Sequence, residues 1–194
     1  MVTENGKSLW APLLTDDLLR RTARLKLVIT DVDGVLTDGG IFFSESGEAL
    51  KRFSVRDGMG VERLRNQGIE TAFLTREQSA IVARRAEKLR IRHCYQGVAD
   101  KAAFLPELLA KAGVTAEEIA YIGDDVNDEE IMTAVAERGL VGAPFDAVPS
   151  VLRRAHRCCA LPGGCGAFRD FAEWILELRS QALQPSALEK KEVR

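Results

Sequence analysis

Short apolar runs alternate along this chain with longer segments in which apolar residues recur every three or four positions. The runs are rich in β-branched and aliphatic residues, which is typical of strands buried on both faces. Strands that alternate with helices predict an α/β fold, a doubly wound, mostly parallel sheet with helices on both faces. We expect core strands at 25–31, 69–75, 92–95, 119–123 and 140–143, and helices at 15–24, 57–66, 79–90, 100–112, 128–137, 148–155 and 168–180.

Residues 39–53 depart from this alternation. Two partly aromatic segments flank the polar stretch 44–48, and Ser46-Gly47 is a favourable turn, so we predict a projecting β-hairpin. Such an apolar hairpin must cover an active site or pack against another subunit. No separate cap domain fits between it and the next helix.

Length and charge narrow the class of protein. The 194 residues fit one domain, with a core at 25–180 and flexible ends at 1–12 and 181–194. A net charge of −2 gives no electrostatic footprint for nucleic acid or a membrane surface. We see no signal peptide or membrane-spanning run, and four cysteines without a C-x-x-C pair favour a reducing, cytoplasmic location.

Polar residues follow several of the predicted strands. Asp31 and Asp33 are two positions apart, so in an extended chain their side chains point to the same side. Thr75 ends the second strand, Asp124 follows a later one, and Lys101 lies in the first turn of a helix. The carboxyl ends of parallel strands meet at one crevice, so we expect these groups to converge there. Oxygen ligands of this kind suit Mg²⁺.

This set of groups fits phosphoryl transfer. The Asp31 carboxylate is placed to attack phosphorus, and Asp33 to give a proton to the leaving alkoxide and later to take one from water. Thr75, Lys101 and Mg²⁺ would hold the phosphoryl oxygens.

The same residues resemble the four ordered motifs of the haloacid dehalogenase superfamily of phosphatases. The motifs are D-x-D-G-V at 31–35, the strand-ending Thr75, Lys101, and G-D-D-x-x-D at 123–128. The resemblance implies a nucleophile at Asp31 and a general acid/base at Asp33, with phosphate bound by Thr75 and Lys101. It also implies Mg²⁺ held by Asp31, the Asp33 carbonyl and Asp124, with Asp125 and Asp128 in support.

Further motifs resemble the 3-deoxy-D-manno-octulosonate 8-phosphate phosphatases and their relatives that act on nine-carbon (nonulosonate) 9-phosphates. They are T-D-G-x-I at 37–41, F-x-V-R-D-G at 53–58, Y-Q-G at 95–97 and G-G-x-G-A at 163–167. This resemblance implies a small sugar-acid phosphate as substrate. It also implies a homo-oligomer, a tetramer without cap domains, in which hairpins pair and a neighbour closes each active site.

Two features point to different substrates. Glu77 after Thr75, with Arg85 and Lys88 on the next helix, resembles the nine-carbon branch, whereas Val55-Arg56-Asp57-Gly58 resembles the eight-carbon branch. Arg56, Glu77, Arg85 and Lys88 are therefore the candidate substrate-binding residues, and the three cations could pair with a sugar carboxylate. A phosphatase or phosphomutase for another small metabolite, and a non-catalytic subunit, are the alternatives.

Overall fold

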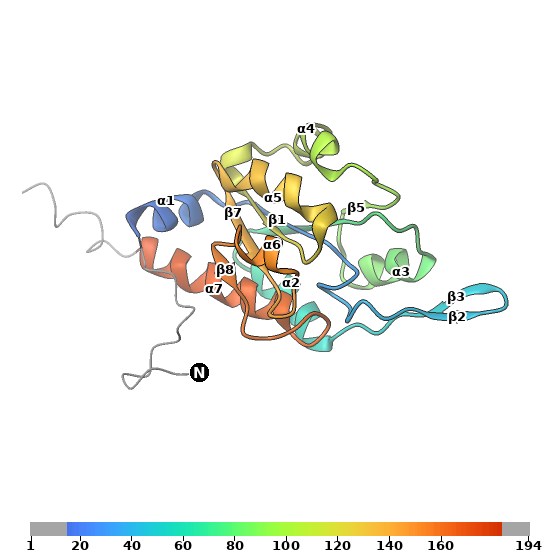
Figure 1. Cartoon of the computed structure of the whole chain (residues 1–194). Helices are drawn as coiled ribbons and strands as arrows, with labels where there is room; N and C mark the ends of the chain where they lie inside the picture. The colour runs from blue at the N-terminus through green and yellow to red at the C-terminus, as the bar shows by residue number, and fades with distance from the viewer. Residues whose placement is uncertain (1–14, 184–194) are drawn as a thin grey trace, which may run out of the picture.

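The centre of the structure is a six-stranded parallel sheet with strand order β5-β4-β1-β6-β7-β8 (Figure 1). The computed structural model describes residues 15–183. The strands are β1 (Leu27–Thr30), β2 (Phe42–Ser44), β3 (Gly47–Leu50), β4 (Glu70–Leu74), β5 (His93–Tyr95), β6 (Ile119–Ile122), β7 (Leu140–Ala143) and β8 (Arg157–Cys158). The helices are α1 (Asp16–Arg24), α2 (Val55–Arg65), α3 (Ala80–Lys88), α4 (Lys101–Ala112), α5 (Glu129–Ala136), α6 (Pro149–Leu152) and α7 (Ala167–Ala182), with 3-10 turns η1 (Ala116–Glu118) and η2 (Val126–Asp128).

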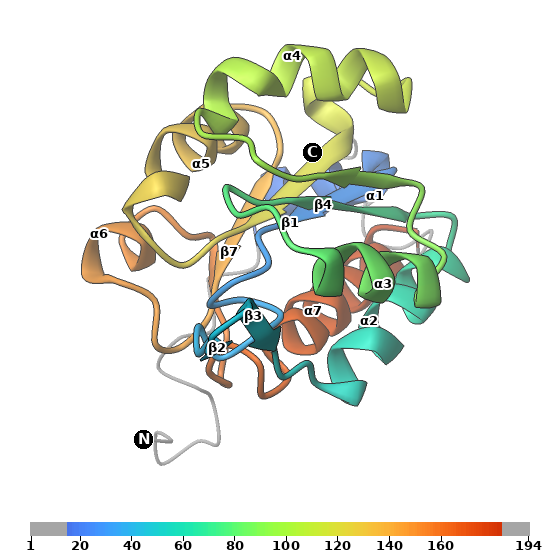
Figure 2. The same ribbon diagram turned by 90° about the vertical axis from the view of Figure 1, so that its right-hand side faces the viewer.

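Side chains of the central strand alternate between two hydrophobic layers. In β1, Val28 packs with residues of α1, α2, α3 and α7, whereas Leu27 and Ile29 pack with residues of α4, α5 and α6. Figure 2 shows α4 and α5 on one side of the sheet and α2, α3 and α7 on the other. Because both faces are covered, every residue of β1, β6 and β7 is buried. The predicted doubly wound sheet is confirmed, and its burial explains why these strands are continuous apolar runs.

The predicted hairpin is also confirmed, as the antiparallel pair β2–β3 that extends away from the sheet in Figure 1. Its tight turn pairs Ser44 with Gly47. Only residues 51–54 connect β3 to α2, so this position holds no cap domain. Among the helices within residues 15–183, none is both long and apolar enough to cross a bilayer.

The start of α2 corrects one sequence prediction. The helix predicted at 57–66 begins at Val55, and Ser54 caps it, because the Ser54 hydroxyl accepts a hydrogen bond from the Arg56 amide at 3.1 Å. Asp57 is buried in the first turn and accepts a hydrogen bond from the Arg169 amide at 2.9 Å. Helix α7 has no side-chain cap at its own N-cap residue. Asp57 therefore caps α7 from a neighbouring helix.

Other element limits shift at their ends. The helix predicted at 128–137 is divided into η2 and α5, because Asp125 and Asp128 form a capping box. The helix predicted at 148–155 ends at Leu152, and the chain then joins the sheet, where the His156 amide bonds the Val141 carbonyl at 2.9 Å. Helix α7 continues to Ala182, two residues into the segment 181–194 that was predicted to be flexible. The predicted flexible segment 1–12 and residues 184–194 lie outside the described residues.

Removing the Asp57 carboxylate should destabilise the docked pair α2 and α7. We expect Asp57→Ala to lower the free energy of unfolding by about 1–2 kcal/mol, the usual effect of losing a helix cap. Asp57→Asn should lose less, because its amide oxygen still accepts from Arg169. Urea unfolding measures both, with Glu177→Ala, at an exposed position of α7, as the control. A loss in Asp57→Ala no larger than in the control would contradict this role.

Candidate active site

The carboxyl ends of three neighbouring strands bring the predicted groups together. Asp31 follows β1, Thr75 follows β4 and Asp124 lies just beyond β6, and these strands are adjacent in the sheet. All three residues line one open pocket. The convergence expected from the parallel sheet is therefore present, and it places acidic groups and a hydroxyl around a common space.

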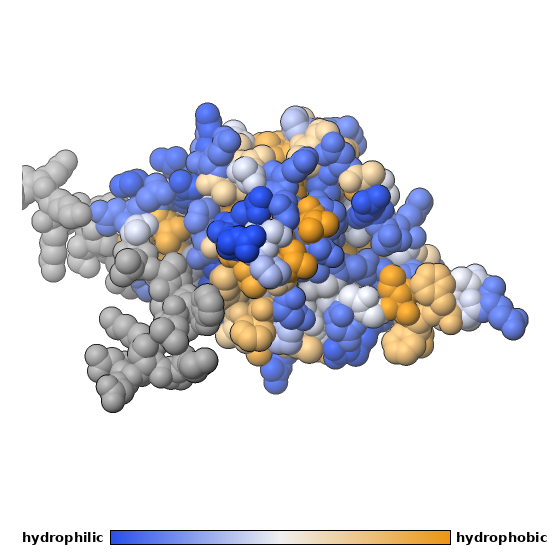
Figure 3. Space-filling view, viewed as in Figure 1, coloured by the Kyte–Doolittle hydropathy of each residue, from blue (hydrophilic) through white to orange (hydrophobic). Residues whose placement is uncertain are grey.

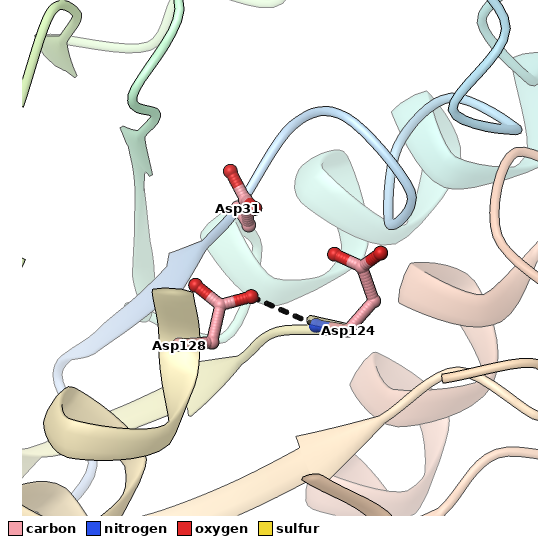
Figure 4. A group of neighbouring side chains, drawn as sticks. All are labelled: Asp31, Asp124 and Asp128. Carbon is pink, nitrogen blue, oxygen red and sulfur yellow. Dashed lines mark hydrogen bonds between the residues drawn. The ribbon is translucent and has the colours of Figure 1, made fainter. Parts of the chain in front are cut away.

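Three carboxylates form a compact cluster at this pocket, of which Asp31 and Asp124 line the pocket and Asp128 is buried behind them. Oxygens of Asp31, Asp124 and Asp128 lie within 4.8 Å of one another (Figure 4). Asp31 comes from the end of β1, whereas Asp124 and Asp128 come from the segment that joins β6 to α5. The Asp124 amide donates to the Asp128 carboxylate at 2.8 Å, which fixes the loop that carries Asp124.

A buried lysine joins two of these carboxylates. Lys101, the first residue of α4, places its ammonium 2.9 Å from Asp31 Oδ2 and 2.5 Å from Asp128 Oδ1. The Tyr121 hydroxyl donates to the same Asp128 oxygen at 2.6 Å. Burial opposes the charge on Lys101, but the two carboxylates outweigh it and hold the Lys101 pKa above its usual value. Lys101 therefore stays cationic next to Asp31.

The cluster carries more negative charge than one lysine neutralises. Burial and the Asp128 charge raise the pKa of Asp31 to about 7. Burial and the Asp31 charge raise the pKa of Asp124 to about 8. Asp124 Oδ1 is buried and has no hydrogen-bond partner within the described residues. Crowded hard oxygen ligands with an unsatisfied atom suit a divalent cation such as Mg²⁺.

The backbone of Gly34 lies close against the Asp124 carboxylate. Gly34 has φ of +90°, which disfavours other residues, and a Cβ there would overlap Asp124 Oδ2. The late glycine-rich loop supports the same segment, since the Gly164 amide bonds the Val35 carbonyl at 3.0 Å. Glycines in both loops therefore allow the close approach of backbone and carboxylate.

Asp33 lines the pocket but lies outside the three-carboxylate cluster. Its two carboxylate oxygens accept hydrogen bonds from Lys51 at 2.6 and 2.7 Å. Neither Lys51 nor Tyr121 was predicted from the sequence. Lys51 directly follows the hairpin strand β3, and Tyr121 lies in the buried apolar strand β6. The sequence around each residue therefore gives no indication that it belongs to the site.

Some of the remaining predicted site residues line the pocket and others do not. Glu77 and Asp125 line the pocket, together with Arg76. The Asp125 carboxylate accepts the Val126 amide at 2.7 Å and so caps η2, outside the three-carboxylate cluster. Asp125 therefore holds the loop that also carries Asp124, and its role in supporting a metal stays a prediction.

The cations predicted to bind substrate do not line this pocket. The Arg85 guanidinium donates to the Ser54 carbonyl at 3.0 Å and lies over the Phe53 ring. Lys88 lines a different hollow, between α2 and the end of α3, and Arg56 is exposed. Within this single chain these three side chains therefore lie outside the pocket that Asp31 lines, with Arg85 and Lys88 beside α2, and their role in binding substrate stays a prediction.

Comparisons with known proteins agree with this geometry. Over 163 residues the chain is 42% identical to the 3-deoxy-D-manno-octulosonate 8-phosphate phosphatase of Yersinia pestis, covering 84% of this chain and 86% of that protein. The crystal structure of the Yersinia pestis enzyme aligns with a TM-score of 0.80 at 40% identity, over 87% of this chain and 90% of that one. The Moraxella catarrhalis enzyme, solved with magnesium, phosphate and 3-deoxy-D-manno-octulosonate (KDO), aligns at 0.78 and 34%, over 87% and 95%. No family model matches the chain.

The parallel sheet and its lysine-bridged aspartates define the class, a hydrolase with the haloacid dehalogenase fold. Within that class, the chain belongs to the 3-deoxy-D-manno-octulosonate 8-phosphate phosphatase family. Named members of this family are phosphoric monoester hydrolases.

The charge balance of the cluster predicts how stability and Mg²⁺ binding depend on pH. Asp31 and Asp124 have raised pKa values, about 7 and about 8, so the folded, metal-free protein binds protons more tightly than the unfolded chain. The stability that these groups contribute is present at low pH and is lost as the pH rises from about 4 to 8. Mg²⁺ competes with these protons, so its stabilising effect should grow over the same range.

Thermal unfolding with and without Mg²⁺ at pH 5.5 and pH 8 tests this. A metal concentration of about 100 times Kd stabilises by about 2.7 kcal/mol, which corresponds to a rise in Tm of roughly 5–10 °C. We expect that rise at pH 8 and a much smaller one at pH 5.5. Asp124→Asn should be more stable than wild type without metal at pH 8 and should not respond to Mg²⁺. An equal Mg²⁺ response at both pH values would contradict the assignment.

Proposed function

We propose that this chain is a Mg²⁺-dependent phosphatase that hydrolyses 3-deoxy-D-manno-octulosonate 8-phosphate through an aspartyl-phosphate intermediate. The observation that carries the proposal is the Asp31 carboxylate, held 2.9 Å from the Lys101 ammonium at the edge of an open pocket beside Asp124. An oriented carboxylate, a fixed cation and a metal-type acidic cluster are the groups that phosphoryl transfer needs.

Each group has a specific task in this mechanism. The Val32 amide donates to Asp31 Oδ1 at 2.6 Å and Lys101 contacts Oδ2, so the carboxylate is held in one orientation for attack on phosphorus. Thr75 contributes a hydroxyl and Lys101 a positive charge toward the phosphoryl oxygens. Asp33 donates a proton to the leaving sugar oxygen and later accepts one from water.

Asp31, Asp124 and the Asp33 carbonyl would hold Mg²⁺, and Asp128 would orient Asp124. When bound, the ion supplies positive charge that offsets the repulsion between the carboxylates and the phosphate. The Moraxella catarrhalis relative, solved with magnesium, phosphate and KDO, supports this assignment.

The eight-carbon substrate is favoured over the nine-carbon one. The relatives compared above act on the octulosonate phosphate. Of the features that resembled the nine-carbon branch, only Glu77 lines the pocket, whereas Arg85 and Lys88 do not. The nine-carbon phosphate remains the second candidate because Glu77 stands at the pocket rim.

A panel of substrates tests the function. Phosphate release is measured with Mg²⁺ for the eight-carbon and nine-carbon keto-acid phosphates and for a hexose phosphate, each at low concentration. We expect the highest kcat/KM for 3-deoxy-D-manno-octulosonate 8-phosphate. Preference for the nine-carbon ester would change the substrate, fast turnover of the hexose phosphate alone would favour another metabolite, and no turnover would indicate a non-catalytic subunit.

We further propose that the hairpin mediates a homo-oligomer, and that this oligomer is a tetramer. Phe42, Phe43 and Leu50 are 62%, 72% and 64% exposed, and hydrophobic residues gather on the hairpin beyond the body of the molecule (Figure 3). Both strands of the hairpin have a free edge within the described chain. An apolar two-stranded ribbon is marginal alone, so a second copy of the same hairpin is its natural partner.

Replacing Phe43 with aspartate should break this association, because a charge would be buried in the interface. We expect the variant to elute at a smaller molar mass by light scattering, with the core fold retained by circular dichroism. Phe145→Asp, at a residue that is 60% exposed between β7 and α6, is the control and should keep the wild-type mass. A wild-type chain that is monomeric at micromolar concentration would overturn the proposal.

We place the enzyme in the cytoplasm. All four cysteines are free thiols, as expected in a reducing compartment.

A further inference from the structure

Lys51 has an unusual environment for a lysine at the base of a hairpin. Its side chain has 0% exposure, and its ammonium is 3.1 Å from Glu48 as well as within hydrogen-bond distance of both Asp33 oxygens. Burying an ammonium is strongly unfavourable unless carboxylates compensate its charge. The charge of Lys51 is therefore compensated by two specific carboxylates. One of them belongs to Asp33, the proposed general acid and base.

The contact restricts Asp33 strongly. Lys51 binds both oxygens of the carboxylate at 2.6 and 2.7 Å, which fixes the plane of the group. The other side-chain contact of Asp33 is the Thr37 hydroxyl at 3.4 Å, which is weak. Asp33 remains 19% exposed and lines the pocket. Its orientation toward the pocket thus depends mainly on Lys51.

Lys51 is itself anchored. Glu48 on β3 pairs with Lys51 through one oxygen and accepts a hydrogen bond from the Ser79 hydroxyl through the other. Ser79 is the N-cap residue of α3. The chain of contacts from Asp33 through Lys51 and Glu48 to Ser79 joins the loop after β1, the hairpin and α3, so Lys51 cannot move without breaking several contacts.

We propose that Lys51 is a positioning residue that holds Asp33 in the geometry for proton transfer. This inference rests on the proposed function. In the first step the Asp31 oxygen bonds phosphorus, the bond from phosphorus to the sugar oxygen breaks, and that oxygen takes the electron pair and the Asp33 proton. In the second step a water oxygen bonds phosphorus, the bond to Asp31 breaks, and the water proton returns to Asp33. Lys51 acts only through Asp33.

The leaving group distinguishes this role from a structural one. A sugar alkoxide needs a proton as it departs, whereas p-nitrophenolate is stable without one. We expect Lys51→Met to lower kcat/KM for the sugar-acid phosphate by about 10²-fold and for p-nitrophenyl phosphate by less than about 5-fold. Lys51→Arg keeps the charge and should recover about 10-fold for the sugar-acid phosphate. Lys26→Met, at a lysine that is 60% exposed, is the control and should match wild type for both esters.

A double-mutant cycle with Asp33→Asn completes the test. If Lys51 acts through Asp33, adding Lys51→Met to Asp33→Asn should cost little further for the sugar-acid ester. Equal losses for both esters, no loss, or fully additive losses would each overturn the inference. Failure of the proposed function is separate: wild type would then not hydrolyse the sugar-acid phosphate, or Asp33→Asn would itself show no dependence on the leaving group.

Discussion

Asp31→Asn should abolish phosphate release while leaving the protein folded. An amide oxygen does not form a stable acyl phosphate, so the two-step route is lost, and removal of a nucleophile costs factors of about 10³ or more in kcat. The substitution should not lower the free energy of unfolding, because it removes a negative charge whose burial is unfavourable. The Asp31 pKa is raised to about 7, which shows that the neutral form is tolerated at this position. We therefore expect unchanged or higher thermal stability without metal at pH 8.

The measurement is phosphate release from the sugar-acid ester with saturating Mg²⁺, alongside thermal unfolding of the same samples. Wild type quenched during turnover should carry an acid-stable, hydroxylamine-labile phosphate, and Asp31→Asn should carry none. Asp17→Asn removes a carboxylate that is 53% exposed, and it should retain wild-type activity. Activity in Asp31→Asn within about 10-fold of wild type would rule out Asp31 as the nucleophile.

Lys101→Met should reduce both stability and activity. Its ammonium is fully buried and bridges Asp31 and Asp128, so the substitution leaves two buried carboxylates without their cation. Breaking a buried pair in this way costs about 3–5 kcal/mol. The loss should be largest at pH 8, because Asp31, whose pKa is raised to about 7, is then ionised, and smaller at pH 5.5, where Asp31 is protonated. Loss of the charge beside the phosphoryl group should lower kcat by about 10²–10³-fold.

Helix α4 offers a matched control for this variant. Lys111 lies near the other end of α4, is 53% exposed and pairs with Glu107. Lys111→Met should change stability by less than about 1 kcal/mol and leave kcat unchanged. Urea unfolding at pH 5.5 and pH 8 separates the two variants. Equal effects of Lys101→Met and Lys111→Met would show that the Lys101 bridge has no special role.

The predicted strands and their acidic ends were recognisable because their causes are local. A strand buried on both faces must be continuously apolar, as in β1 and β6, and a polar residue that follows it marks the sheet edge. Parallel strands bring such ends together, so Asp31, Thr75 and Asp124 could be grouped from their positions in the sequence. Lys101 was recognisable as a cation at a helix start, where acidic residues are usual.

The hydrogen-bond partners of these site residues could not be predicted from the local sequence. Lys51 pairs with Asp33 only because the chain returns from the hairpin beside the loop after β1. Tyr121 meets Asp128 only because the segment after β6 brings Asp128 next to that strand. The same limit applies to the candidate substrate-binding cations. Arg85 and Lys88 share a basic helix, but only the fold shows that Arg85 bonds the Ser54 carbonyl and that Lys88 lines a hollow beside α2.

The layered α/β architecture, the projecting hairpin and the acidic strand ends follow from the order of residues alone, because burial and backbone direction repeat with short periods along the chain. The tertiary structure alone decided which charges neutralise one another and which cap a distant helix, as Asp57 does for α7. Those contacts join residues far apart in sequence, and their energies depend on angstrom-scale distances that only the packed fold determines.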